Sequence, residues 1–146
     1  MLIDAGYEER YWYPDDGGEV WLSGFYPVDA AGRFLGRDAL PDDLIVTNVA
    51  GAAHRPDALA SELAAPGSPL TLVAEPSNAY DPNAVAVLLA SGEPLGYVPR
   101  EVAPLVAAGW SAVVLRERRA SPRDPRTGLT MLLAHAESVS LRVRRD

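Results

Sequence analysis

The sequence predicts a mostly β fold, a small barrel of about six short strands with two short helices. Its 146 residues include 12 Gly and 13 Pro, spread along the whole length. This spacing is typical of many short elements rather than of long helices. The apolar segments are short, turn residues separate them, and strands do not alternate regularly with helices. These features favour a small barrel over a parallel sheet.

Residues 1–43 are expected to form an N-terminal arm or hairpin extension, rich in aromatic and acidic residues, that precedes a barrel domain at residues 44–146. Two aromatic runs, at 11–13 and 20–22, are separated by a Pro-Asp-Asp-Gly-Gly segment, and this pattern predicts a loose hairpin. Residues 27–43 contain two prolines and two glycines and are expected to form a loop.

The first half of the barrel domain alternates apolar runs with turn residues. Residues 44–49 form an apolar run that predicts a buried strand, and residues 57–65 suit a short helix, with Pro-Asp at its start and Pro-Gly after its end. Residues 70–74 predict a strand, residues 75–83 a long polar turn, and residues 84–90 a strongly apolar strand.

The second half begins with a hairpin turn at residues 91–94 and a return strand at 95–98. A helix is expected over 99–108, because a proline suits its first turn and a glycine follows its end. Residues 111–118 and 129–143 are expected to be strands, joined by a loop rich in proline and arginine.

The chain is acidic overall, and its charge is unevenly distributed. It has 13 Arg, no Lys and 20 Asp plus Glu, a formal net charge of −7. Residues 1–43 carry ten acids and three Arg, whereas residues 100–146 carry nine Arg and five acids. The total charge argues against a broad nucleic-acid surface, but the separation of sign suggests an acidic arm and a basic face. Alternatively, the two ends neutralise each other or are merely solvated.

Composition also restricts the class of protein and its compartment. The chain has no cysteine, which excludes a disulfide scaffold, a cysteine-ligated zinc site and a thiol nucleophile. No apolar run approaches the roughly 18 residues of a membrane span, so no membrane partner is expected. The N-terminus lacks the basic start and apolar middle of a signal peptide. We therefore expect a cytoplasmic protein.

Signatures of enzymes are mostly absent. There is no phosphate-binding loop, no Gly-x-Gly-x-x-Gly and no Gly-x-Ser-x-Gly. The two histidines, His54 and His135, belong to no spaced metal-binding set. We therefore expect no catalysis, no metal and no cofactor. A hydrolase that uses Asp57, Asp81 and Glu75 is a weaker alternative.

The most informative segment is the polar stretch at residues 75–87. Asn78, Asp81 and Asn83 can each hydrogen-bond their own backbone, as turn residues do, and the segment is then an ordinary connection between two strands. Tyr80 does not fit that interpretation well, because a solvated turn does not need a large aromatic side chain. The segment is therefore a candidate binding loop.

The return strand adds a second aromatic residue, Tyr97, and a cation, Arg100, which are expected to lie close to this loop. An aromatic plane can stack on a nucleobase, which is worth roughly 1–3 kcal/mol per base. The planar fork of Arg100 can hold a phosphate. The carboxylate of Asp81 repels phosphate but can accept a hydrogen bond from a free sugar hydroxyl, so this set suits the end of a strand.

Three blocks of residues carry a family resemblance: Asn48-Val49-Ala50-Gly51, then Glu75-Pro76-x-Asn78-x-Tyr80-Asp81-Pro82-Asn83-Ala84-Val85-x-Val87, then Gly92-x-x-Leu95-Gly96-Tyr97-Val98-Pro99-Arg100. The chain resembles the HIRAN domain over residues 44–118, with an extension to 143 expected. The resemblance implies a six-stranded barrel similar to OB and SH3 folds. It also implies nucleic-acid binding, with capture of the 3′-hydroxyl end of single-stranded DNA in repair or replication-fork processing.

In eukaryotes the HIRAN domain is joined to helicase-like ATPases that carry a zinc RING module, and neither module is present in this sequence. The chain resembles instead the stand-alone bacterial form. The resemblance therefore implies a non-catalytic module with single-stranded DNA 3′ ends as its partner, and with a helicase or nuclease as a further protein partner.

The resemblance also implies roles for individual residues. Tyr80 matches the aromatic residue that stacks on a terminal base, and Asp81 matches the carboxylate that accepts the 3′-hydroxyl. Asn78 matches a polar contact to the terminal nucleotide, and Arg100 matches a basic contact to phosphate. Tyr97 occupies a position that can be histidine in the family, where it contacts the DNA backbone.

One part of the chain departs from the family pattern. DNA-binding members have an arginine and an aromatic residue shortly after the first strand, and Ala53 and His54 occupy these positions here, followed by Arg55. One phosphate contact and one stacking surface are thereby put in doubt. His54 can still stack, and Arg55 can replace the missing cation with a shift of one residue. Both are therefore included among the candidate DNA-binding residues.

A protein-interaction module without DNA binding is the alternative function. The arm contains an aromatic cluster of the kind found at the core of interfaces: Trp12, Tyr13, Trp21, Phe25 and Tyr26. Simple packing of the arm onto the barrel explains the same residues.

Overall fold

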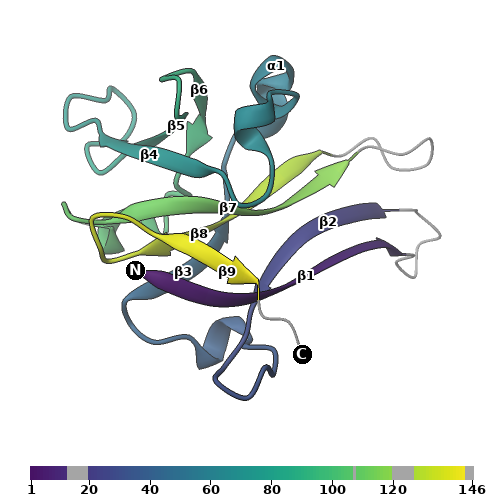
Figure 1. Ribbon diagram of the computed structural model, residues 1–146. Coiled ribbons are helices and arrows are strands. Elements are labelled where there is room, and N and C mark those ends of the chain that lie inside the picture. The colour runs from purple at the N-terminus through teal and green to yellow at the C-terminus, as the bar shows by residue number, and fades with distance from the viewer. Residues whose placement is uncertain (13–19, 107, 120–126, 144–146) are drawn as a thin grey trace.

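The computed structural model describes residues 1–12, 20–106, 108–119 and 127–143, and it confirms a mostly β fold (Figure 1). In these residues nine strands form one sheet: β1 (Leu2–Trp12), β2 (Val20–Pro27), β3 (Leu44–Asn48), β4 (Pro69–Ala74), β5 (Val85–Leu89), β6 (Pro94–Tyr97), β7 (Ser111–Arg119), β8 (Gly128–Ala134) and β9 (Ser140–Val143). The helical segments are short: α1 (Pro56–Leu59) and the 3-10 turns η1 (Arg37–Ala39), η2 (Ala52–His54), η3 (Glu62–Ala64) and η4 (Ala103–Leu105).

Strand β7 lies at the centre of the sheet. β8 pairs with one of its edges, while the other edge pairs with β4 near Ala112 and with β2 from Arg116 to Arg119. Beyond β4 come β5 and β6, and beyond β2 come β1 and β9. The sheet therefore divides into two branches that diverge from β7 (Figure 1).

The expected six-stranded barrel is not confirmed, because the sheet of the described residues is not closed. In the strand order β3–β8–β7–β4–β5–β6, the two outermost strands are β3 and β6. In the described residues, an isolated bridge joins Ala50, two residues after β3, to Tyr97 at the end of β6. There the N–H of Ala50 donates to the carbonyl of Tyr97 (2.7 Å), and the N–H of Tyr97 donates to that of Ala50 (2.9 Å). Gly51 follows with a φ of 78° and turns the chain into η2, so the ladder stops after one pair of residues.

The β7–β8 pair is buried on both faces, which accounts for its apolar sequence. Val114 and Met131 belong to a core cluster shared with β4, β5 and β6. Val113 and Leu132 belong to a second cluster, against which Ile3 of β1 packs. Because successive residues of a strand point to opposite faces, uninterrupted apolar runs in both strands fill both clusters.

The two expected helices are much shorter than predicted. The segment 57–65 divides into α1 and η3, because Ser61 is extended (ψ 144°) and its Oγ accepts a backbone N–H two residues later (3.2 Å). In the described part of the predicted helix at 99–108, the helical structure is the short 3-10 turn η4. Residue 107 lies outside the described residues. Pro104 lies within that turn and has no N–H to donate to a longer helix.

The expected single strand at residues 129–143 is two strands, because its halves pair with different partners. β8 pairs with β7, whereas β9 pairs in parallel with β1, with Ser140 opposite Leu2. The end of this segment is only partly covered, since Val139 is buried, whereas Val143 at the end of β9 is exposed.

The N-terminal arm pairs as antiparallel strands, as predicted, with Trp12 opposite Val20. The predicted turn at residues 14–18 lies outside the described residues, as do the side chains of Trp12, Tyr13 and Trp21. β2 pairs with β7, and β1 pairs with β9, so the arm contributes to the same sheet. A domain boundary at residue 44 stays a prediction.

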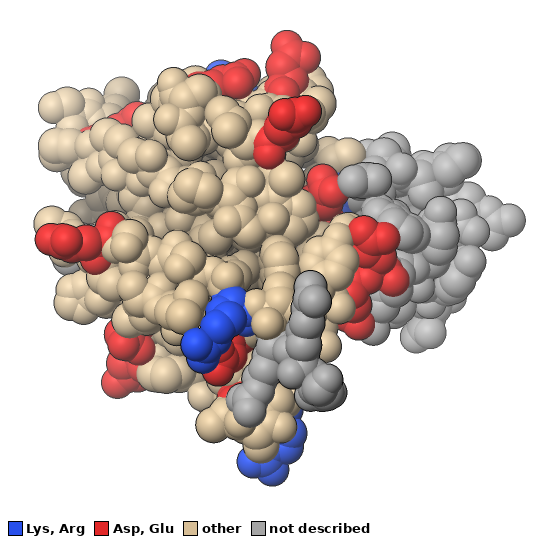
Figure 2. All heavy atoms as spheres, viewed as in Figure 1, with Lys and Arg blue, Asp and Glu red and all other residues tan. Residues whose placement is uncertain are grey.

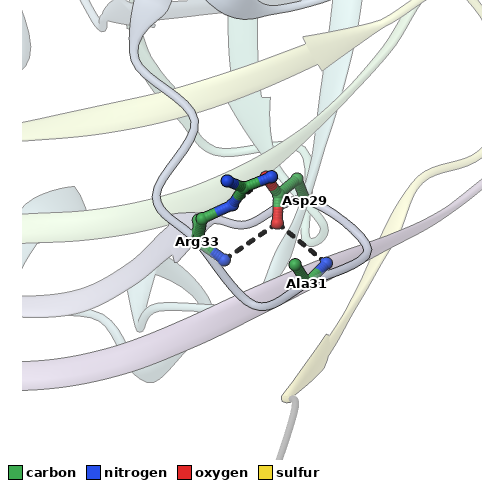
Figure 3. A network of polar contacts seen from close by, with 3 residues as sticks. All are labelled: Asp29, Ala31 and Arg33. Carbon is green, nitrogen blue, oxygen red and sulfur yellow. Dashed lines mark hydrogen bonds and ion pairs between the residues drawn. The ribbon is translucent and has the colours of Figure 1, made fainter.

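The segment after β2 contains a tight turn closed by a bridge between Val28 and Phe34. Asp29 Oδ1 accepts the backbone N–H groups of Ala31 and Arg33, each at 2.9 Å, and Oδ2 accepts Arg33 Nε at 3.1 Å (Figure 3). These bonds, led by the one from the Arg33 backbone, hold the pKa of Asp29 below its ordinary 3.8. The turn fixes Phe34, which is 65% exposed.

One end of the sheet carries the candidate site. There α1 and η2 lie against β6, and the hydroxyl of Tyr97 in β6 donates a hydrogen bond to Glu75 at the start of the loop between β4 and β5. In the part of the chain that the structure describes, no helix has the length and apolar character needed to cross a membrane.

Candidate functional site

The loop between β4 and β5, residues 75–84, is shaped by its own side chains. Asn78 Oδ1 accepts the backbone N–H groups of Tyr80 (2.9 Å) and Asp81 (3.1 Å). Asp81 Oδ1 accepts the N–H of Asn83 (2.9 Å), and the first N–H of the loop donates to its last carbonyl (2.8 Å). Asn and Asp stabilise turns in this way. The predicted turn is thus confirmed, and the oxygen of Asn78 is used within it.

Tyr80 extends from this loop into solvent. Its side chain is 93% exposed, the highest value among the large hydrophobic residues described. Its backbone is nevertheless held, because its own N–H and that of Asp81 are both bonded to Asn78. A fixed backbone with an open ring suits an aromatic surface for stacking.

Asp81 and Arg100 lie side by side, as the sequence predicts. Asp81 Oδ2 is 4.0 Å from Arg100 Nε, and the side chains are 18% and 82% exposed respectively. An ion pair this long and this exposed contributes little to stability. Arg100 therefore remains displayed to solvent beside the half-buried carboxylate.

Tyr97 at the end of β6 is held at both its backbone and its hydroxyl. The backbone forms the bridge to Ala50, and the hydroxyl donates to Glu75 Oε1 (2.9 Å). The hydrogen bond to Glu75, then burial and the Glu75 charge, raise the pKa of Tyr97, while the charge of Arg55 opposes this. The residue is 38% exposed, so part of it is accessible to a ligand.

Gly96 is required for the backbone to approach this closely. A Cβ at residue 96 would lie 2.3 Å from the carbonyl oxygen of Ala50 and 2.8 Å from Val49 Cγ1. The absence of a side chain therefore allows the bridge between Ala50 and Tyr97, and with it the position of Tyr97.

A hollow of about 320 Å³ lies against Tyr97. Its lining includes His54, Arg55 and Glu75, with Gly96 and apolar β5 residues beneath. His54 and Arg55 are exposed, and Arg55 makes no ion pair within the described part of the chain. The hollow therefore combines an aromatic wall, an imidazole and a guanidinium.

The predicted site residues form two groups, and Glu75, which was not among them, connects the two groups. Asn78, Tyr80, Asp81 and Arg100 belong to the loop group, and His54, Arg55 and Tyr97 surround the hollow. Glu75 Oε1 accepts hydrogen bonds from both groups, through Asn78 Nδ2 (3.0 Å) and the Tyr97 hydroxyl (2.9 Å). In the sequence, Glu75 opens the second block of the family resemblance, but the only role predicted for it is in the weaker hydrolase alternative. Its signal was weak, a carboxylate three residues before the asparagine of a turn.

Nothing in the described residues suggests a metal centre. No three His, Asp or Glu side chains gather in a way that could hold an ion there. His54 lines the hollow, while His135 stacks on Trp110 with ring centroids 5.2 Å apart. The two histidines thus have separate surroundings.

Charge at the site is nearly balanced. The cations Arg55 and Arg100 each have a carboxylate near them, Glu75 and Asp81 respectively. Figure 2 shows acidic groups around the margin of one face, and the basic groups described on that face form no broad patch. The arrangement suits a small ligand contact in which stacking is central and a few charges are locally placed.

Comparison with known proteins gives one match. The family model described as the HIRAN domain matches residues 43–134, well over half of the chain. No curated protein and no solved structure matches the sequence.

Proposed function

Because the chain belongs to the HIRAN domain family, we propose that it binds nucleic acid by capturing the 3′-hydroxyl end of a single DNA strand. The observation that supports this best is Tyr80, an aromatic side chain 93% exposed on a loop with a held backbone. Asp81 follows Tyr80 in the loop, and its Oδ2 lies 4.0 Å from Arg100 Nε.

In this proposal Tyr80 stacks on the terminal base, worth roughly 1–3 kcal/mol. Oδ1 of Asp81 holds the turn, and Oδ2, 4.0 Å from Arg100 Nε, accepts the terminal hydroxyl. Arg100 pairs with the adjacent phosphate through its planar fork. Arg55 and His54, which line the hollow beside Tyr97, contact the preceding nucleotide.

Selectivity for an end follows from the charge of Asp81. A 3′-phosphate or an internal phosphate at this position would place two negative charges together. The group that attracts the hydroxyl therefore rejects the alternative strands.

Fluorescence anisotropy at one fixed salt concentration tests this proposal, with strands that carry a 5′ label and end in a 3′-hydroxyl or a 3′-phosphate. We expect the hydroxyl end to bind at least about tenfold more tightly, the worth of one hydrogen bond to a charged group. A strand with a blocked 3′ end and an RNA strand complete the series. Equal affinity for the two DNA ends contradicts the mechanism.

Asp81→Asn is the matched variant, because an asparagine oxygen can still accept the N–H of Asn83 and keep the turn. Without the negative charge of residue 81, the ratio of the affinities for the 3′-hydroxyl strand and the 3′-phosphate strand should fall towards one. Unchanged discrimination would assign selectivity to another group.

We further propose that the protein makes and breaks no bond itself. A helicase or nuclease partner would then act on the captured end.

A second candidate function is protein interaction, and Phe34 favours it. Phe34 is 65% exposed and its ring lies 6.1 Å from that of Tyr26, centroid to centroid. Both rings line a hollow of about 410 Å³ together with Phe25 and Arg116. If no oligonucleotide binds even at low salt, this surface becomes the leading candidate.

A further inference from the structure

A single carboxylate oxygen connects the two groups of the candidate site. Glu75 Oε1 accepts the hydroxyl of Tyr97 at 2.9 Å and the side-chain amide of Asn78 at 3.0 Å. The backbone of Glu75 is also held, because its N–H donates to Ala84 (2.8 Å) and its carbonyl accepts from the N–H of Asn78 (2.9 Å). Glu75 is therefore fixed where β4 ends.

The contacts continue from Glu75 to the exposed residues of the loop. The amide of Asn78 donates to Glu75 through Nδ2, and its Oδ1 accepts from the backbone N–H groups of Tyr80 and Asp81. Glu75 thereby fixes which way the amide of Asn78 faces, because only one end of that amide can donate. The orientation of Tyr80 and Asp81 thus depends on a side chain that neither of them touches.

We propose that Glu75 is the positioning residue of the end-binding site: it ties β6, through Tyr97, to the loop that presents Tyr80 and Asp81. This inference rests on the proposed function and adds a residue that the ligand itself need not contact. Both bonds link a charged acceptor to neutral donors, the stronger class of hydrogen bond.

Two further observations agree with this role. The hydrogen bond to Glu75 raises the pKa of Tyr97 above its ordinary 10.0, which agrees with a hydroxyl that remains protonated and donates to Glu75. Arg55 lines the same hollow and opposes the negative charge of Glu75. The carboxylate therefore serves as an acceptor without leaving the hollow strongly negative.

Two substitutions of Glu75 separate its acceptor role from its charge. Glu75→Ala removes both hydrogen bonds, and we expect binding of the 3′-hydroxyl strand to weaken about tenfold. Discrimination against the 3′-phosphate should also fall, because Asp81 is no longer held. Glu75→Gln keeps an oxygen that can accept both bonds and should bind within about twofold of the wild type. Glu62→Ala, an exposed carboxylate on η3, is the control and should bind as the wild type does.

A double-mutant cycle tests whether Glu75 acts through Tyr97. Tyr97→Phe keeps the ring and removes the donor to Glu75. If the two residues act as one unit, the Glu75→Ala Tyr97→Phe double variant should lose no more affinity than Glu75→Ala alone. Fully additive losses would overturn the connection.

Amide hydrogen exchange gives a readout that does not depend on DNA. The N–H groups of Tyr80 and Asp81 are bonded to Asn78 Oδ1, so they should exchange faster in Glu75→Ala but not in Glu75→Gln. Faster exchange together with weaker binding supports the proposal. Unchanged exchange in Glu75→Ala, or binding by Glu75→Gln as weak as by Glu75→Ala, overturns it. Faster exchange in a protein that binds no oligonucleotide overturns the proposed function and retains the positioning of the loop.

Discussion

At the scale of single residues, the site depends on what each side chain is already bonded to. The side-chain oxygen of Asn78 already accepts hydrogen bonds from two backbone N–H groups, so its role is to shape the loop before any ligand binds. A direct contact from Asn78 to the terminal nucleotide stays a prediction. Tyr80 and Arg100, by contrast, are largely exposed to solvent, and they are therefore the residues most able to form new contacts with a ligand.

Tyr80→Ala should weaken binding of a 3′-hydroxyl strand by about 1–3 kcal/mol, the worth of a base stack. Because the ring is 93% exposed, the free energy of unfolding should change by no more than about 0.5 kcal/mol. Anisotropy and thermal melting measure the two effects. Arg142→Ala is the comparison, because Arg142 pairs with Asp4 on β1 (2.7 Å). A larger loss of affinity for Arg142→Ala would move the site to the C-terminal strand.

At the scale of elements, backbone geometry decides where the site can form. The isolated bridge between Ala50 and Tyr97 requires that Gly96, the residue before Tyr97, has no side chain. Gly51 then turns the chain so that His54 and Arg55 line the hollow. Short turns rather than helices supply these positions. We therefore expect substitutions that change the backbone, as well as changes in the polar groups, to affect the site.

Gly96→Ala should destabilise the fold by about 1–3 kcal/mol, because its Cβ would lie 2.3 Å from the Ala50 carbonyl oxygen. Chemical denaturation measures the change. Gly128→Ala on β8 is the matched control, since its Cβ would meet no atom within 4 Å, and it should be neutral or slightly stabilising. Equal stability of both variants would show that the bridge can adjust.

The turn around Asp29 should loosen in acid. Its pKa is lowered in the folded protein, so the stabilisation is complete above the ordinary value of 3.8 and is lost as pH falls through the lowered pKa. The amide signals of Ala31 and Arg33, followed by NMR during acid titration, should shift together in that range. Asp29→Asn, which can still accept but has no charge, should remove this dependence on pH.

At the scale of the whole molecule, the net charge of −7 limits how the protein can bind DNA. A net charge this negative argues against a broad basic surface that neutralises many phosphates. Among the described residues of the site, Arg55 and Arg100 are the cations placed to contact phosphate. Binding should therefore involve one strand end and few counterions. Selectivity would come from the hydroxyl and the stack rather than from charge.

The salt dependence of binding should accordingly be shallow. Two phosphate contacts on a single strand predict a slope of log K against log salt of about −1.4, and Arg55→Ala should reduce it to about −0.7. Anisotropy titrations at four or more salt concentrations measure the slope. A slope unaffected by Arg55→Ala would exclude Arg55 from contact with phosphate.

Sequence by itself determined the features that depend on neighbours along the chain. The turn at Asn78 and Asp81 arises from bonds that span two or three residues, and the short apolar runs identify most strands, so both could be predicted. The family resemblance, confirmed over residues 43–134, came from the same local blocks.

Tertiary structure alone decided what depends on distant contacts. The bond between Glu75 and Tyr97 joins residues 22 apart in sequence, and the bridge at Ala50 joins two strands that are not consecutive. The expected single strand at 129–143 is likewise divided because β9 pairs with β1, whereas β8 pairs with β7. Residues that are close in the sequence are compatible with many different strand pairings. Packing of the whole sheet selects one of these pairings, so contacts between distant residues are decided only in the folded structure.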